Sequence, residues 1–243
     1  MGKTKEERRN WLKNPLCLSL DVDDKSLGLS LVHLIGHSVG MIKAGPIPYL
    51  SFGPDLLREA EKSGFKIFLD MKWHDIPNTV HDVIAGLPSP SIRMITIHSL
   101  GGPSMIAAAR KACDSLGPER PKLIAVTALT HLTTDELRQI GLPDRKTVVE
   151  RLGTMALDYG ADGLVLSPRE LLQARTSWGD LPFLVTPGIR LTDSKIPGDD
   201  QNLADTPWTA VRQGSDLLVV GRPILQAPDP LQTVRRILSE IEG

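Results

Sequence analysis

Eight short apolar runs alternate along the chain with eight longer segments of helical character, and this alternation constrains the fold more than any other feature. Many residues of the runs are β-branched, as is typical of buried strands. The runs cover residues 16–22, 39–44, 66–70, 92–97, 122–127, 162–166, 183–186 and 216–220. The predicted helices cover residues 25–36, 54–63, 77–87, 103–116, 146–159, 168–176, 206–213 and 228–241.

Alternating strands and helices imply parallel strands joined by right-handed crossovers. Eight repeats in 243 residues match the number and size of a (β/α)8 barrel, or TIM barrel. A doubly wound open sheet is the alternative, but it usually has fewer strands, and the sequence holds neither a Gly-x-Gly-x-x-Gly turn nor a P-loop. We therefore predict a single TIM-barrel domain over residues 1–243, with residues 1–14 as a peripheral N-terminal extension.

Charge and composition exclude several classes of protein. The 28 Lys and Arg residues nearly balance the 29 Asp and Glu residues, and aromatic residues make up 4% of the chain. A nucleic-acid partner is not expected, because such binding calls for a basic excess or for aromatic stacking platforms. No apolar run approaches the roughly 18 residues of a membrane span.

Two features indicate a cytoplasmic protein with no membrane partner. Residues 1–13 mix basic and acidic side chains and lack the apolar stretch of a signal peptide. Cys17 and Cys113 are far apart in the sequence and have apolar neighbours, so we predict two reduced, buried thiols.

Polar residues gather at or just after the C-terminal ends of the predicted strands. A parallel barrel buries its strands and carries its active site at those ends, so we predict the active site there. Ordinary polarity at strand ends is the alternative interpretation. The residues concerned are Asp21, Lys43, Asp70, Lys72, His98, Thr127, Thr130, Arg190, Gly221 and Arg222.

The densest charged stretch runs from Asp70 to Asp75. Side chains two apart on a strand project to the same side, which would place Asp70 beside Lys72. With Lys43 from the neighbouring strand and Asp75 from the following turn, an alternating array of two lysines and two aspartates is possible. Such an array could repel an anionic substrate group and present an ammonium as proton donor. A solvated cluster of surface ion pairs is the alternative.

The loops after the seventh and eighth predicted strands suit a phosphate, which barrels often bind there through backbone N–H groups. Gly221 would let the backbone approach closely, and Arg190 and Arg222 would add positive charge. A glycine turn with a surface arginine is the alternative. The long polar segment between Arg190 and Trp208 is predicted to be a lid.

A metal site is a weaker possibility. His33 and His37 lie four residues apart on a predicted helix, but no cysteine or carboxylate partner accompanies them, so no metal is expected.

The charged stretch also resembles a known family. Asp70-x-Lys72-x-x-Asp75-Ile76-Pro77-Asn78-Thr79-Val80 resembles the signature of the orotidine 5′-phosphate decarboxylase family, whose members catalyse the last step of UMP synthesis. The resemblance extends over most of the chain. It includes the segments 18–21, 98–105, 126–130, 187–190, 200–201 and 221–224, together with Lys43.

The resemblance implies a role for each matching residue. Lys72 would protonate C6 of the pyrimidine, and Asp70 would face the departing carboxylate. Asp21 and Lys43 would contact the ribose hydroxyls, with Lys43 also in the charged array. Thr130 would approach the pyrimidine, and the phosphate would be held by Arg190, Gln201, Gly221 and Arg222.

The resemblance also implies a homodimer that uses neither a metal nor an organic cofactor. In the family, the counterparts of Asp75 and Thr79 reach into the partner subunit's site. Two other functions stay open. One is an Mg²⁺-dependent sugar-phosphate decarboxylase or aldolase of the same superfamily, which would need a further acidic metal ligand. The other is a non-catalytic barrel that binds nucleotides.

Overall fold

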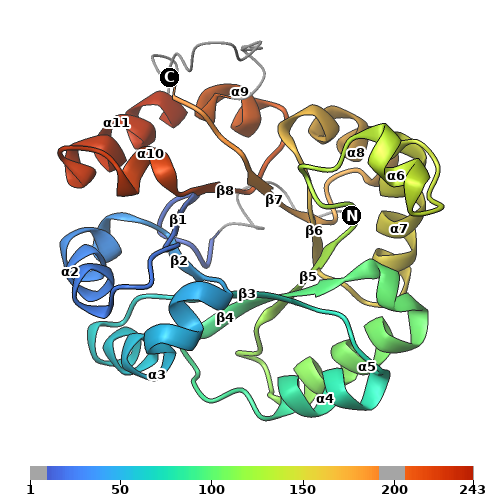
Figure 1. Cartoon of the computed structure of the whole chain (residues 1–243), viewed down its shortest axis with the longest axis horizontal. Helices are drawn as coiled ribbons and strands as arrows, with labels where there is room; N and C mark the ends of the chain where they lie inside the picture. The colour runs from blue at the N-terminus through green and yellow to red at the C-terminus, as the bar shows by residue number, and fades with distance from the viewer. Residues whose placement is uncertain (1–9, 192–205, 243) are drawn as a thin grey trace.

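The computed structural model describes residues 10–191 and 206–242, which form a closed barrel of eight parallel strands in sequential order (Figure 1). The strands are β1 (Leu16–Ser19), β2 (Met41–Ala44), β3 (Ile67–Trp73), β4 (Ile92–His98), β5 (Lys122–Val126), β6 (Gly163–Val165), β7 (Phe183–Pro187) and β8 (Leu217–Val220). Cys17 pairs with Met41 on one side and with Val219 on the other, which closes the barrel between β1 and β8. The predicted TIM barrel is confirmed.

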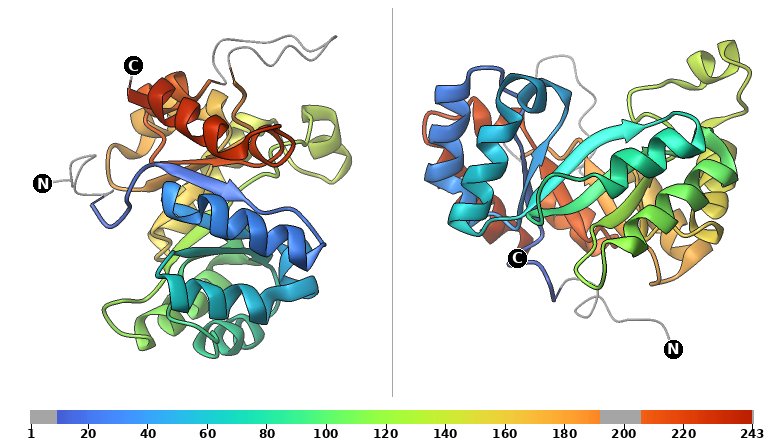
Figure 2. Two further views of the ribbon diagram at one scale, coloured as in Figure 1. Left: turned by 90° about the vertical axis from the view of Figure 1, so that its left-hand side faces the viewer. Right: turned by 90° about the horizontal axis from the view of Figure 1, so that it is seen from below.

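Helices surround the barrel and connect each strand to the next (Figures 1 and 2). They are α2 (Lys25–Ile35), α3 (Pro46–Ser63), α4 (Pro77–Ala85), α5 (Gly102–Ser115), α6 (Thr134–Gln139), α7 (Arg145–Asp158), α8 (Leu171–Trp178), α9 (Pro207–Arg212), α10 (Arg222–Leu225) and α11 (Pro230–Glu242). Short 3-10 turns lie at Gly36–Ser38, Ser99–Gly101 and Pro168–Glu170. In these ranges no helix is both long and apolar enough to cross a bilayer.

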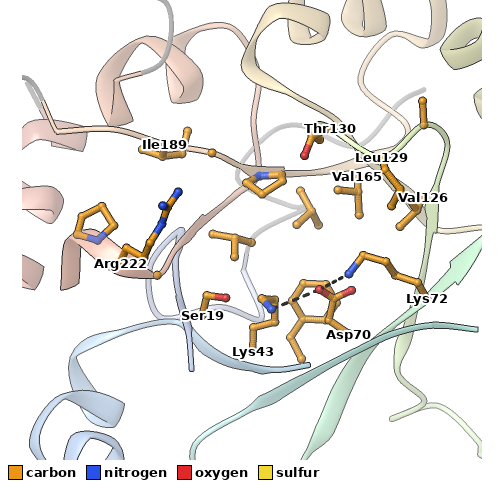
Figure 3. A pocket seen from close by; sticks show the side chains of 18 residues that line it. Ser19, Lys43, Asp70, Lys72, Val126, Leu129, Thr130, Val165, Ile189 and Arg222 are labelled. Atoms are coloured by element: carbon orange, nitrogen blue, oxygen red, sulfur yellow. Dashed lines mark hydrogen bonds and ion pairs between the residues drawn. The ribbon is translucent and has the colours of Figure 1, made fainter. Parts of the chain in front are cut away.

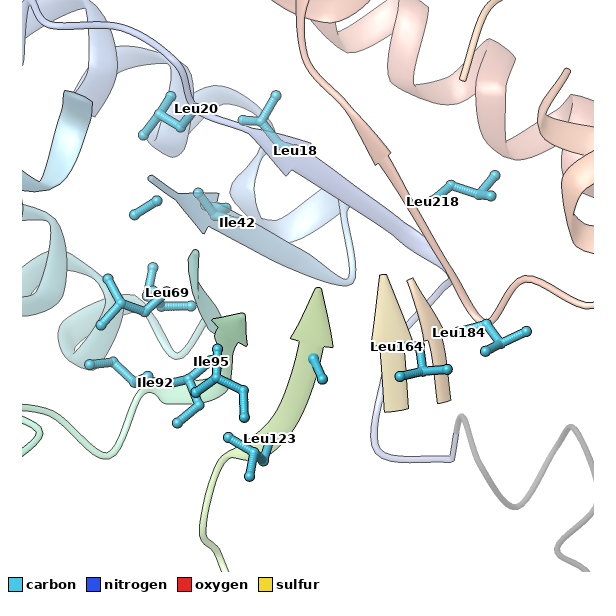
Figure 4. Packing of buried hydrophobic residues seen from close by; sticks show 14 of the residues in the cluster. Leu18, Leu20, Ile42, Leu69, Ile92, Ile95, Leu123, Leu164, Leu184 and Leu218 are labelled. Atoms are coloured by element: carbon cyan, nitrogen blue, oxygen red, sulfur yellow. The ribbon is translucent and has the colours of Figure 1, made fainter. Parts of the chain in front are cut away.

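The strands are buried on both faces, which explains their nearly continuous apolar sequences. One face of each strand packs against the surrounding helices, as Leu18, Ile42, Ile95 and Leu218 do in Figure 4. The other face fills the barrel interior, where Cys17, Met41, Phe68 and Met94 belong to a second cluster. The two faces alternate with the period of two that a strand imposes.

The N-terminal end of the barrel is covered by part of the predicted extension. Trp11 and Leu12 pack against the interior cluster. The Trp11 ring lies 5.8 Å from that of Phe183, and the ammonium groups of Lys66 and Lys122 lie over it. These contacts leave the opposite end, where the strands finish, as the mouth of the barrel.

Several element bounds differ from those predicted. Strand β1 ends at Ser19, so Asp21 lies beyond it, whereas β3 continues to Trp73 and includes Lys72. Helix α3 begins at Pro46 instead of residue 54, because it continues through Pro54 with a kink at Phe52. A proline in the middle of a kinked helix resembles a first-turn proline in sequence.

Two short helices were not predicted. Helix α6 stands out from the mouth of the barrel (Figure 2) and begins with a capping box formed by Thr133 and Glu136. Helix α10 consists of the four residues Arg222–Leu225, too few to show a helical period.

Candidate active site

Strand β3 carries a bulge at its charged residues. Leu69 pairs with Ile95 and Trp73 pairs with Ile97, so three residues of β3 stand against one residue of β4. Within the bulge, Lys72 has a φ of 50°, the only positive φ of a non-glycine residue in the described ranges. Such a backbone is uncommon and mildly strained. The bulge therefore sets the direction of the Lys72 side chain.

Four charged side chains form a row across the mouth, which we call the charged row: Asp21, Lys43, Asp70 and Lys72. The Lys72 Nζ lies 2.9 Å from Asp70 Oδ2, and the Lys43 Nζ lies 3.4 Å from the same oxygen. The Lys43 Nζ also lies 3.3 Å from Asp21 Oδ1. The charges thus alternate in sign from the segment after β1, across β2, to β3, and Figure 3 shows the lysines on either side of Asp70.

The electrostatics keep the centre of the row charged. Burial alone would raise the pKa of Asp70, but the charges of Lys43 and Lys72, with hydrogen bonds from Lys72 and Thr96, lower it overall. Burial alone would lower the pKa of Lys43, but the carboxylates of Asp70 and Asp21 raise it overall. At neutral pH Asp70 and Lys43 therefore hold fixed charges in desolvated positions.

A cavity of about 310 Å³ opens above the row (Figure 3). Lys43, Asp70 and Lys72 line one end of it, and most of the remaining wall comes from the C-terminal ends of β5, β7 and β8 and the residues that follow them. Figure 3 shows Arg222 on the side of the cavity away from Lys72. The site therefore combines an acid–base end with a positively charged end.

The glycines at this second end allow close packing. A Cβ atom on Gly221 would lie 3.2 Å from the Cβ of Ser19, a tight contact. Gly188 has a φ of 80°, which favours glycine. Both residues line the cavity together with Arg222. A second pocket of about 930 Å³ adjoins the first and is lined by both Arg190 and Arg222.

Most of the predicted site residues come together at this mouth. Lys43, Asp70, Lys72, Thr130, Gly221 and Arg222 line the first cavity, Arg190 lines the adjoining pocket, and Asp21 belongs to the charged row. Gln201 lies outside the described residues.

Two predicted residues do not join the cavity within one chain. Asp75 and Thr79 are exposed and do not line it. The Asp75 Oδ1 accepts a hydrogen bond of 2.6 Å from the backbone N–H of Ile76. The array expected from residues 43, 70, 72 and 75 is therefore not assembled by a single chain, in which Asp21 supplies the second aspartate of the row.

Two buried hydroxyls next to the row were missed by the sequence analysis. Ser19 donates to Asp21 Oδ2 at 2.7 Å, and Thr96 donates to Asp70 Oδ1 at 2.8 Å. Each lies inside an apolar run, and this is the only signal that could have revealed them. The signal is weak, because threonine is common in strands.

His98, at the end of β4, packs beside the row and not in it. Its ring stacks on that of His74 at 5.5 Å, and its Nδ1 accepts the N–H of Leu100 at 3.3 Å. Burial, with the charges of His74 and Lys72, lowers the pKa of His98 to about 4. His98 is therefore neutral at physiological pH and adds no charge to the mouth.

The weak metal candidate is part of the helix packing instead. The His33 Nε2 lies 2.8 Å from Glu59 Oε1, and the His37 ring packs edge-on against Phe65. Across residues 10–191 and 206–242, no group of three or more His, Cys, Asp or Glu side chains could hold a metal ion.

A closed (β/α)8 barrel with a row of lysines and aspartates at its mouth has the organisation of a barrel enzyme. The family model described as "Orotidine 5'-phosphate decarboxylase / HUMPS family" matches residues 14–237. The chain belongs to this family.

Individual relatives agree with the family assignment. The chain is 39% identical to the orotidine 5′-phosphate decarboxylase of Nitrosomonas europaea, covering 93% of this chain and 96% of that protein. It is 38% identical to the orotidine 5′-phosphate decarboxylase of Legionella pneumophila, and the match covers 93% of this chain and 98% of that protein. The crystal structure of the Lactobacillus acidophilus orotidine 5′-phosphate decarboxylase has a TM-score of 0.82 and 34% identity, covering 95% of this chain and 100% of that chain.

Proposed function

We propose that this chain decarboxylates orotidine 5′-phosphate to UMP and CO2, the last step of pyrimidine nucleotide synthesis, without a metal or an organic cofactor. The observation that carries the proposal is the charged row at one end of a cavity whose other end holds Arg222. Family membership and the names of the relatives support it.

The charged row suits the chemistry of this step. Breaking the bond between C6 and the carboxylate leaves an electron pair on C6, with no adjacent group to delocalise it. The protein must therefore stabilise the carbanion electrostatically and deliver a proton at once. Lys72 is proposed to do both, by placing its ammonium at C6 and transferring a proton from Nζ to carbon.

Asp70 and Lys43 complete the reacting end. The Asp70 carboxylate lies 2.9 Å from the Lys72 Nζ, so the departing carboxylate is proposed to lie against it and to be repelled. Lys43 keeps Asp70 charged, and with Asp21 it is proposed to bind the ribose hydroxyls.

The phosphate is proposed to bind at the arginine end. Arg222 and Gly221 line the cavity there, and Arg190 lines the adjoining pocket. Gln201, which lies outside the described residues, is proposed to contact the phosphate as well. Thr130 is proposed to contact the pyrimidine between the two ends. The lid predicted between Arg190 and Trp208 lies mostly outside the described residues. Because the phosphate is remote from C6, its contacts are proposed to close this lid and exclude water.

The active form is proposed to be a cytoplasmic homodimer with shared active sites. Asp75 and Thr79 are proposed to reach the site of the partner subunit. Their exposure supports this, and so does the neighbouring Ile76, an apolar side chain that is 66% exposed. The free, buried Cys17 and Cys113 are consistent with a reducing compartment.

The reaction is tested by following the loss of orotidine 5′-phosphate absorbance with purified protein in excess EDTA. We expect turnover to continue in EDTA. Turnover that appears only with added Mg²⁺ would favour a metal-dependent decarboxylase or aldolase acting on a sugar phosphate. UMP binding without any turnover would favour a non-catalytic barrel.

Replacing Arg222 tests the phosphate end. We expect Arg222→Ala to weaken UMP binding about ten- to a hundredfold, because a hydrogen bond to a charged group contributes roughly 1.5–3 kcal/mol. Uridine, which lacks the phosphate, should bind both proteins equally when measured by calorimetry. Arg151→Ala, at an exposed position of α7, is the control and should bind UMP normally. Equal losses for UMP and uridine would contradict a phosphate role.

A further inference from the structure

The bulge in β3 removes a backbone donor from the strand ladder. Pairing with β4 is interrupted between Leu69 and Trp73. In this interval the backbone N–H of Lys72 donates to the Thr96 hydroxyl, at 2.8 Å. Buried N–H groups need a partner, and here a side chain of β4 replaces the missing carbonyl. Thr96 thereby supports the one strained non-glycine backbone among the described residues.

The same hydroxyl fixes the Asp70 carboxylate. The Thr96 Oγ1 donates to Asp70 Oδ1 at 2.8 Å, while Asp70 Oδ2 faces the ammonium groups of Lys72 and Lys43. A hydroxyl has one proton to donate and two lone pairs to accept with, so it can make both bonds at once. Thr96 is completely buried. Its bond to Asp70 is therefore shielded from water, and its bond to the Lys72 N–H is partly shielded.

We propose that Thr96 is a positioning residue, whose hydroxyl holds the Asp70 carboxylate and the Lys72 backbone in a single reactive arrangement. Thr96 does not line the cavity, so it acts through the two charged residues and not on the substrate. The inference rests on the proposed decarboxylation. It adds to that reaction a residue that sets the geometry of Asp70 and Lys72.

Loss of the hydroxyl has two local consequences. The Asp70 carboxylate loses the bond that holds its Oδ1 and is held only through Oδ2, by the two lysines, so its orientation is less restricted. The part-buried Lys72 N–H loses its acceptor, so the strained backbone of Lys72 can relax and displace the ammonium. A displacement of about 1 Å in a reacting group can lower a rate about a hundredfold.

Thr96→Val tests the proposal, since valine has nearly the size and shape of threonine without the hydroxyl. We expect kcat to fall about ten- to a hundredfold. KM for orotidine 5′-phosphate and Kd for UMP should change less than about twofold, because the contacts to phosphate and ribose are untouched. A merely structural role would predict loss of stability without this separation of kcat from binding.

A second pair of variants isolates the hydroxyl if the valine variant does not fold. Thr96→Ser keeps the hydroxyl and Thr96→Ala lacks it, and both lose the methyl group. We expect the serine variant to retain kcat within about threefold of wild type and the alanine variant to lose about tenfold or more. Thr186→Val is the matched control. Thr186 is a buried strand threonine, and its hydroxyl has no hydrogen-bond partner within the described part of the chain.

The pH profile provides a third readout. In wild type the Thr96 hydrogen bond is one of the contacts that lower the pKa of Asp70. Its loss in Thr96→Val therefore raises that pKa, so Asp70 takes up its proton at a higher pH as the solution is acidified. The acidic limb of kcat/KM should move to higher pH in Thr96→Val and stay in place in Thr186→Val.

The outcomes separate this inference from the proposed function. Wild-type protein that does not turn over orotidine 5′-phosphate overturns the proposed function. Wild-type turnover with an equally active Thr96→Val overturns the role of Thr96 alone. The role is also overturned if Thr96→Ser is as impaired as Thr96→Ala, or if UMP binding falls as much as kcat. The expected pattern has three parts. Thr96→Val lowers kcat without weakening UMP binding, Thr96→Ser keeps kcat close to the wild-type value, and the acidic limb of kcat/KM moves to higher pH in Thr96→Val.

Discussion

Lys72→Ala is expected to lower turnover of orotidine 5′-phosphate by at least about 10³-fold, because it removes both the proton donor and a fixed positive charge. Proton transfer by a positioned group contributes about 10²–10⁴-fold, and a preorganised electrostatic contact about 10²–10³-fold. The barrel should stay folded, because the Lys72 side chain is 37% exposed at the mouth and outside both apolar clusters.

The measurement compares kcat with UMP affinity and thermal unfolding of the same preparation. We expect UMP to bind Lys72→Ala nearly as well as wild type, since Arg222 and Lys43 remain. Lys62→Ala, an exposed lysine in the last turn of α3, is the control for loss of a positive charge and should be fully active. Turnover of Lys72→Ala close to that of wild type would remove Lys72 from the mechanism.

The barrel could be predicted from the sequence because its determinants are local and repeated. Each strand is buried on both faces, so each appears as a short apolar run, and the crossover rule leaves few ways to connect eight of them. The bounds of individual elements were less predictable. The kink at Phe52 and the short α10 depend on tertiary packing, which the local pattern of apolar residues does not indicate.

The charged row was partly predictable. Lys43, Asp70 and Lys72 could be recognised because each is a charged residue at the C-terminal end of a buried strand, which is where a barrel carries its active site. The spacing of Asp70 and Lys72 predicted their contact, although the structure makes that contact through a bulge and not a regular pleat. The bulge arises from pairing between β3 and β4, so neither strand alone indicates it or the role of Thr96.

Asp75 differs from the rest of the site, because no contact among residues 10–191 and 206–242 brings it to the cavity. The side chain is exposed in the turn before α4, whose first residue is Pro77. We propose that it acts in the site of another subunit. A C2 dimer would then build each site from Lys72 of one chain and Asp75 of the other.

This arrangement predicts that two inactive variants restore activity when they share a dimer. Lys72→Ala and Asp75→Asn are expected to be nearly inactive as separate homodimers. After they are unfolded, mixed in equal amounts and refolded, about half of the dimers should contain one chain of each kind. In each mixed dimer one site carries both substitutions and the other carries neither. Activity should therefore return to about a quarter of the wild-type value.

A second mixture makes the result specific to Asp75. Lys72→Ala mixed with Asp70→Asn should stay inactive, because Asp70 and Lys72 contact each other within one chain and every site then keeps one substitution. Mass spectrometry of both mixtures establishes that mixed dimers form. Recovery in the first mixture and not in the second assigns Asp75 to the opposite subunit from Lys72. Mixed dimers of Lys72→Ala and Asp75→Asn that remain inactive would show that each chain builds its site alone, and the exposure of Asp75 would then have no catalytic meaning.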